Sequence, residues 1–132
     1  MLRTCLFLFL AAGCDLGTVT APGGTNPATP GVDAGMIPPG TTPQQSFTAN
    51  VYPVLQAQCA GCHTTGGNAN FCAATAAAAY TAIVGQPTVV GTFDPATAPL
   101  LTKIAAGHNG TAYTTAQSSA ISAWLSAEKA TR

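Results

Sequence analysis

The chain has 132 residues, enough for one small domain, and only 6% of them are charged, with four Lys or Arg residues balanced by four Asp or Glu residues. No basic patch is available to neutralise phosphates, so the composition argues against a nucleic-acid partner. It also argues against strong electrostatic steering of any other partner.

Residues 1–13 have the pattern of an export signal. Arg3 supplies a positive charge, residues 6–12 form a short apolar run, and small residues lead up to Cys14. The run is about half of the roughly 20 residues that a membrane-spanning helix needs, so we expect no permanent transmembrane anchor. A cysteine directly after small residues resembles a bacterial lipoprotein signal, which implies lipidation of Cys14 after cleavage. The alternative is an ordinary signal peptide that happens to contain Cys14.

Residues 14–45 are expected to be the lipidated N-terminus followed by a disordered tether. After Cys14 the composition changes to Gly, Pro and Thr, without an aromatic residue or spaced apolar positions that could bury a face. Such a tether would let a domain move between membrane-bound partners, or would only hold it clear of the lipid surface.

Residues 46–132 are expected to form one all-α domain, because no sustained alternation of apolar and polar residues predicts a strand. Ser46 is expected to cap a first helix, whose apolar stripe leads towards Cys59. Pro53 should kink this helix or restart it, because proline removes an intrahelical hydrogen bond.

The first helix leads into Cys59-Ala-Gly-Cys62-His63, the attachment signature of c-type haem. Two thiols one helical turn apart can add to the two vinyl groups of one porphyrin, and His63 can then bind the iron as the proximal ligand. A redox dithiol is the first alternative, but it needs a strand before the motif. The second is zinc, held by Cys59, Cys62, Cys72 and either His63 or His108.

Three further helices are predicted after the motif. The Ala-rich residues 73–84 favour a helix that Gly85 ends, and residues 87–95 are expected to form a loop. A short helix is predicted from about Pro99 to Gly107, and the last from about Thr115 to Lys129.

Cys72 is left over if Cys14 carries lipid and Cys59 and Cys62 carry haem. An odd cysteine in an exported protein indicates either intermolecular pairing or a free thiol. We expect a buried free thiol, because free cysteine behaves as a small apolar residue.

Residues 46–132 resemble a small mono-haem cytochrome c domain of the bacterial periplasm. The resemblance rests on Val51-Tyr-Pro-Val-Leu55 before the haem motif, on Ala79-Tyr-Thr-Ala-Ile-Val-Gly85, and on the closing Ile121-Ser-Ala-Trp-Leu125. It implies an all-α fold of three to five helices around one haem, with the first and last helices crossing and Trp124 packing against Phe47 or Tyr52.

The family also supplies methionine as a second iron ligand, and here the sequence departs from it. The two methionines, Met1 and Met36, both precede the motif. His108 is the remaining histidine, and its flanking glycines would let the backbone approach a porphyrin. It is therefore the expected sixth ligand. An exposed loop histidine, ligation by Lys103 or Tyr113, and five-coordinate iron are the alternatives.

The resemblance implies one-electron transfer, and we expect an exported, membrane-tethered electron carrier that is not an enzyme. Its partners would be redox proteins of the cell envelope and, through the lipid, a membrane. It would lie on the periplasmic side of a bacterial membrane or at the outer membrane or cell surface. A haem-based gas binder, a peroxidase-like catalyst with an open sixth position, and a zinc-binding surface lipoprotein remain alternatives.

Overall fold

The computed structural model describes residues 37–64 and 69–132, and these residues form helices and no strand, as predicted. The signal peptide, Cys14 and the tether up to residue 36 lie outside the described residues. The elements, in chain order, are α1 (Pro43–Ser46), the π-helical η1 (Phe47–Val51), α2 (Tyr52–Gln58), α3 (Ala60–His63), α4 (Ala76–Val84), α5 (Pro87–Val90), α6 (Pro99–Ala105), the 3-10 turn η2 (His108–Gly110) and α7 (Thr115–Ala130).

The described residues contain seven α-helices, more than the three to five expected. Several are short because prolines divide the chain: α1, α2, α5 and α6 each have proline in the first or second helical position. Proline is preorganised for the first turn of a helix but cannot donate a backbone hydrogen bond within it.

The first helix begins earlier than predicted, and Ser46 does not cap it. Thr42 is the N-cap, and its hydroxyl accepts from the amide of Gln45 while the Gln45 side chain accepts from the amide of Thr42. This capping box satisfies two backbone donors, and Pro43 follows at the first helical position. Ser46 instead lies inside the helix, 1% exposed, with no hydrogen-bond partner for its hydroxyl oxygen.

Pro53 restarts the first helix, as predicted. Within η1 the backbone widens, and the amide of Tyr52 donates to the carbonyl of Phe47, five residues earlier. The wider turn lets the chain pass the proline ring, which an unbroken α-helix could not accommodate without distortion. From Tyr52, α2 continues almost directly into α3, which carries the haem motif.

The middle of the chain is more helical than predicted. Thr75 caps α4 through the amide of Ala78, so α4 begins slightly later than expected, and Gly85 ends it as predicted. The expected loop at residues 87–95 is wrong in its first part, because Pro87 starts the single turn α5. Gly91 then ends α5 with φ 58° and ψ −129°, a conformation that favours glycine.

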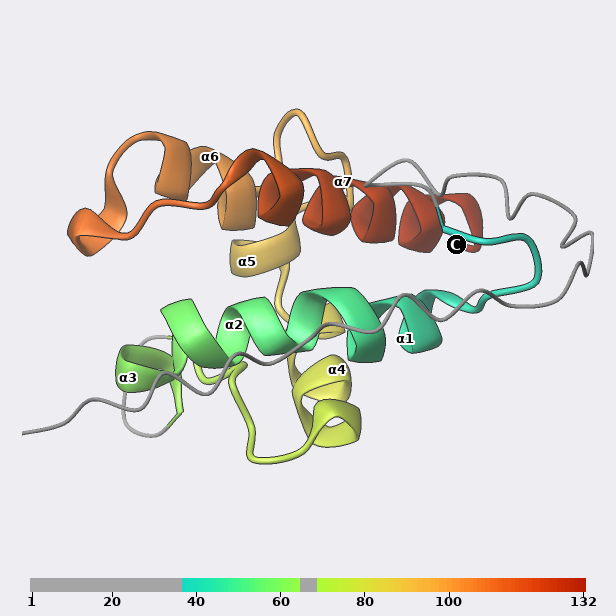
Figure 1. The fold of residues 1–132 in the computed structure, drawn as a ribbon, viewed down its shortest axis with the longest axis horizontal. Helices are drawn as coiled ribbons and strands as arrows, with labels where there is room; N and C mark the ends of the chain where they lie inside the picture. Colours follow the sequence, from blue (N-terminus) through green and yellow to red (C-terminus); the bar gives the residue numbers. More distant parts are fainter. Residues whose placement is uncertain (1–36, 65–68) are drawn as a thin grey trace, which may run out of the picture.

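Figure 1 shows α6 and α7 on one side of the molecule, α1 to α4 on the other, and α5 between them. The first and last helices pack together, as the family resemblance implied, through Phe47 and Trp124, whose ring centroids are 5.1 Å apart. Trp124 also meets Phe93 edge-on at 6.5 Å. Such tilted aromatic pairs each contribute about 0.5–1.5 kcal/mol beyond their burial.

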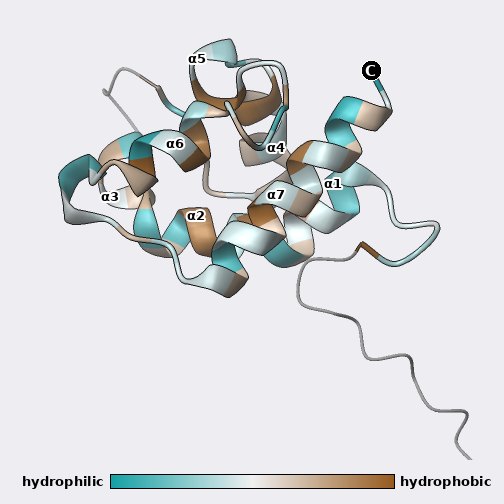
Figure 2. Ribbon diagram, turned by 90° about the horizontal axis from the view of Figure 1, so that it is seen from above, coloured by the Kyte–Doolittle hydropathy of each residue, from teal (hydrophilic) through white to brown (hydrophobic). Residues whose placement is uncertain are grey.

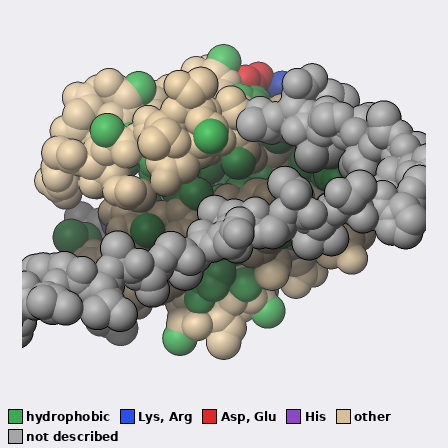
Figure 3. Space-filling model, viewed as in Figure 1, with side chains coloured by type: hydrophobic (Ala, Val, Ile, Leu, Met, Phe, Trp, Pro, Cys, Tyr) green, Lys and Arg blue, Asp and Glu red, His purple; other side chains and the backbone are tan. Residues whose placement is uncertain are grey.

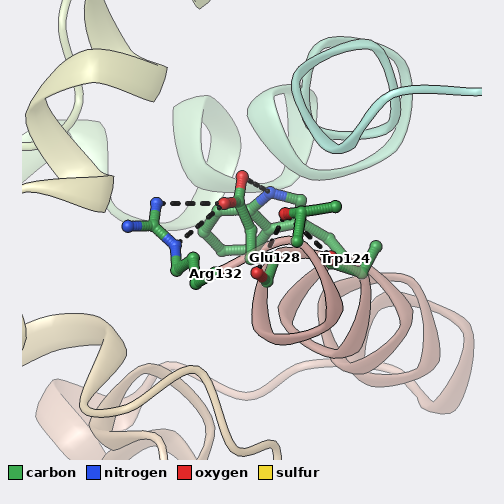
Figure 4. A network of polar contacts seen from close by, with 5 residues as sticks. Trp124, Glu128 and Arg132 are labelled. Carbon is green, nitrogen blue, oxygen red and sulfur yellow. Dashed lines mark hydrogen bonds and ion pairs between the residues drawn. The ribbon is translucent and has the colours of Figure 1, made fainter.

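The hydrophobic residues lie mainly on the sides of the helices that face the interior (Figure 2). The carboxylate of Glu128 is buried with them, 2% exposed. It accepts hydrogen bonds from the indole N–H of Trp124 at 3.2 Å and from the guanidinium of Arg132 at 3.0 Å and 3.3 Å (Figure 4). The guanidinium also lies 4.0 Å from the centre of the Phe93 ring. The hydrogen bonds stabilise the last turns of α7, and the contact of Arg132 with Phe93 joins this end of the helix to the segment after α5.

Candidate functional site

A cavity of about 480 Å³ opens between α3, α5, α6 and the chain before α7. This volume is typical of sites that hold a small organic ligand or cofactor. Its walls include the apolar residues Ala69, Phe71, Val89, Pro99, Leu100 and Ile104. The chemically active side chains on it are Cys59, Cys62, His63, Lys103, His108 and Tyr113.

The haem motif reaches the cavity because the chain is helical through it. The amide of Cys59 donates to the carbonyl of Leu55 at 2.8 Å, and the amide of His63 donates to the carbonyl of Cys59 at 3.0 Å. One helical turn therefore separates Cys59 from Cys62 and His63, which brings all three to one cavity. The element before the motif is the helix α2, whereas a thioredoxin-like dithiol requires a strand there.

His63 is held in one orientation. Its Nδ1 lies 2.8 Å from the carbonyl oxygen of Ala69, and its ring stacks on Phe71 with centroids 4.7 Å apart and planes at 28°. A carbonyl can only accept, so Nδ1 carries the proton and the lone pair is on Nε2. A metal-binding histidine is oriented in this way by the hydrogen bond of its other nitrogen.

His108 faces His63 although the two are far apart in the sequence. Their ring centroids are 6.1 Å apart and their planes meet at 31°. The turn that carries His108 is tight, because Gly107 has φ 90° and Gly110 has φ 71°. His108 is solvent-exposed, as in the alternative of an exposed loop histidine.

The spacing of the two rings fits one metal ion between them. Imidazole nitrogens bind metals such as zinc at about 2.0–2.1 Å, so two imidazoles on opposite sides of an ion have centroids about 6–6.5 Å apart. The 6.1 Å between His63 and His108 lies in this range. Together with the two thiols and the apolar walls, this spacing makes the residues fit a covalently attached haem.

The cysteines differ strongly in environment. Cys59 is 8% exposed and Cys72 1%, whereas Cys62 is exposed. The pKa of Cys59 is lowered to about 6, mainly by interaction with the Cys72 thiol and against the opposing effect of burial. The hydroxyl of Tyr113, whose Oη lies 3.7 Å from the Cys59 sulfur, also lowers this pKa. The same thiol contact, together with burial, raises the pKa of Cys72. Cys59 is thus the more nucleophilic of this pair.

Cys72 is buried and free, as predicted, but it does not line the cavity. This bears on the zinc alternative, which needs Cys72 beside Cys59, Cys62 and a histidine. Within residues 37–64 and 69–132, no three His, Cys, Asp or Glu side chains are grouped so that they could hold a metal ion.

Two parts of the site were not predicted from the sequence. Phe71 and the carbonyl of Ala69 orient His63, but both follow the motif through a segment whose path no local pattern predicts. The contact of Cys72 with Cys59 was missed for the same reason.

Comparison of the chain with protein-family models, with curated proteins and with solved structures finds no match. The assignment of a function therefore rests on the residues of the site.

Proposed function

We propose that this chain is an exported, membrane-tethered electron-transfer protein with one covalently bound c-type haem, and that it is not an enzyme. The observation that carries the proposal is the position of a Cys-x-x-Cys-His motif and a second imidazole, His108, on one largely apolar cavity. When bound, the haem supplies one-electron oxidation and reduction of its iron.

Each residue of the site has a distinct role in the proposal. The thiols of Cys59 and Cys62 form the thioether bonds, and His63 presents Nε2 to the iron while Ala69 fixes its tautomer. His108 is the sixth ligand, since the chain has no methionine after Met36. Histidine in place of methionine lowers the reduction potential, because methionine raises it.

The surroundings suit electron transfer to a protein partner. Phe71, Val89 and Leu100 give the cavity apolar walls that would bury part of a haem, and burial is one of the means by which a protein sets a potential. Few charged side chains appear on the face shown in Figure 3. Docking to redox proteins of the cell envelope therefore depends on apolar contact more than on charge.

The proposal also includes attachment to a membrane. Lipidation of Cys14 would anchor the chain, and the segment up to residue 45 would tether the domain on the periplasmic side of a bacterial membrane or at the outer membrane or cell surface. None of the helices in the described residues has both the length and the apolar character needed to span a bilayer.

The first experiment tests covalent attachment. The chain is expressed with and without a haem-attachment pathway, and its mass is measured after extraction with acidified organic solvent. We expect the mass of one haem to remain on the wild type and on Cys72→Ala. In Cys59→Ala and Cys62→Ala, we expect one thioether bond to the haem or none. Recovery of haem-free protein that binds one zinc would overturn the proposal.

The second experiment tests the role of His108. We expect low-spin, six-coordinate iron in the wild type, and high-spin iron that binds carbon monoxide in His108→Ala. Lys103→Ala and Tyr113→Phe are matched controls on the same cavity and should stay low-spin. If the wild type already binds carbon monoxide as His108→Ala does, the gas-binding alternative replaces electron transfer.

A further inference from the structure

Cys72 is hydrogen-bonded to the backbone of the haem motif and of the helix before it. Its amide donates to the carbonyl of His63 at 3.1 Å, and its thiol donates to the carbonyl of Leu55 at 3.6 Å. That same Leu55 carbonyl accepts from the amide of Cys59 at 2.8 Å. Both cysteines thus converge on one carbonyl group, which brings two buried side chains together, and each thiol is the largest influence on the pKa of the other.

Cys62 is not part of this contact. It is exposed, whereas Cys59 and Cys72 are buried at 8% and 1% exposure. A disulfide needs the two sulfur atoms to be brought into bonding distance without a large movement of the backbone. The thiol buried with Cys59 at the Leu55 carbonyl is that of Cys72, although Cys62 is nearer in sequence.

We propose that Cys59 and Cys72 form a disulfide in the haem-free protein, and that this bond must be reduced before Cys59 can join a porphyrin. The disulfide itself does not depend on the proposed function, whereas its competition with haem attachment does. An exported chain meets an oxidising compartment, in which disulfides form and persist.

The reaction needs an external disulfide as the oxidant, such as glutathione disulfide. Of the two cysteines, Cys59 lines the open cavity and Cys72 does not, so Cys59 is the one of this pair that such a molecule meets first. Its sulfur attacks the external disulfide, which forms a mixed disulfide and releases one thiol. The sulfur of Cys72 then displaces the second thiol. Two S–H bonds are lost, one S–S bond forms, and the external disulfide is reduced to two thiols that take up both protons.

The test uses the full chain prepared without haem and incubated with glutathione disulfide. Chymotrypsin cleaves after aromatic residues, so cleavage at Phe71 separates Cys72 from a fragment that contains both Cys59 and Cys62. Without reduction, a Cys59–Cys72 bond gives two fragments joined in one mass, which reductant separates. A Cys59–Cys62 bond gives a single fragment lighter by two hydrogen atoms.

Variants identify which cysteine of the motif is joined. We expect the linked fragments in the wild type and in Cys62→Ala, and their loss in Cys59→Ala and Cys72→Ala. A bond within the single fragment, or linked fragments that vanish in Cys62→Ala, would overturn the proposal.

The holoprotein separates this inference from the proposed function. With haem attached, Cys72 should remain a free thiol that is alkylated after unfolding, and oxidised haem-free protein should accept haem only after a thiol reductant is added. Linked fragments in a chain that never binds haem would support the disulfide and refute the haem proposal. Equal attachment with and without reductant would overturn the competition.

Discussion

Replacement of Glu128 by glutamine should weaken the last helix. The Glu128 carboxylate is 2% exposed and accepts from the Trp124 indole and from the Arg132 guanidinium. The amide oxygen of glutamine can keep the bond to Trp124, but its NH₂ group would face a guanidinium that can only donate. Glu128→Gln thus removes the charge-assisted bonds and leaves Arg132 without its partner.

The expected loss follows from these contacts. Hydrogen bonds to charged groups contribute about 1.5–3 kcal/mol. The Arg132 side chain is 45% exposed and can be rehydrated, so screening reduces the loss. We expect Glu128→Gln to lower the free energy of unfolding by about 1–2 kcal/mol, which lowers the Tm of a domain of this size by roughly 5–15 °C.

Urea and thermal unfolding of Glu128→Gln, Arg132→Gln and the double variant form a double-mutant cycle that isolates the pair. The matched control is Lys129→Gln, at the neighbouring position on α7. It removes the exposed 2.8 Å ion pair between Lys129 and Asp94 and should cause no measurable change in stability. If Glu128→Gln is as stable as the wild type, or if the two single losses simply add, the contact of Glu128 with Arg132 does not stabilise the end of α7.

Three further outcomes are expected. Burial, and then the hydrogen bond with Glu128, raise the pKa of Tyr80 from 10.0 to about 12. The folded chain therefore keeps the phenol proton to higher pH than the unfolded chain, and the free energy of unfolding should fall as pH rises from 10.0 to about 12. Urea unfolding of Tyr80→Phe should show a smaller fall over the same range of pH. Gly91→Ala should lower the free energy of unfolding by about 1–3 kcal/mol, because φ is 58° there, whereas Gly85→Ala, at φ −84°, should show little change in the same assay. Cys14→Ser should move the protein from the membrane fraction to the soluble fraction, and native protein that is wholly soluble and begins after residue 14 would contradict lipidation.

Local patterns were sufficient to predict most of the helices. Gly85 ends α4 and Pro99 begins α6, because each residue restricts the backbone through its own covalent structure. The Thr42 cap was missed although its signal, Thr-Pro-Gln-Gln, is present in the sequence. The predicted start at Ser46 is wrong because the apolar stripe begins at Phe47, whereas the helix begins in the polar segment before it, at Pro43.

That Cys59, Cys62 and His63 lie on the same side of the chain could likewise be predicted from their spacing, because one helical turn brings all three to the same cavity. The approach of His108 to His63 could not be predicted in this way. It depends on the path of the chain through α4, α5 and α6 and on the turn at Gly107. The contact of Cys72 with Cys59 likewise arises from a segment that returns to Leu55 and His63 through tertiary hydrogen bonds. Local spacing is determined by backbone geometry within a few residues, whereas these contacts follow from how the helices pack around a common core.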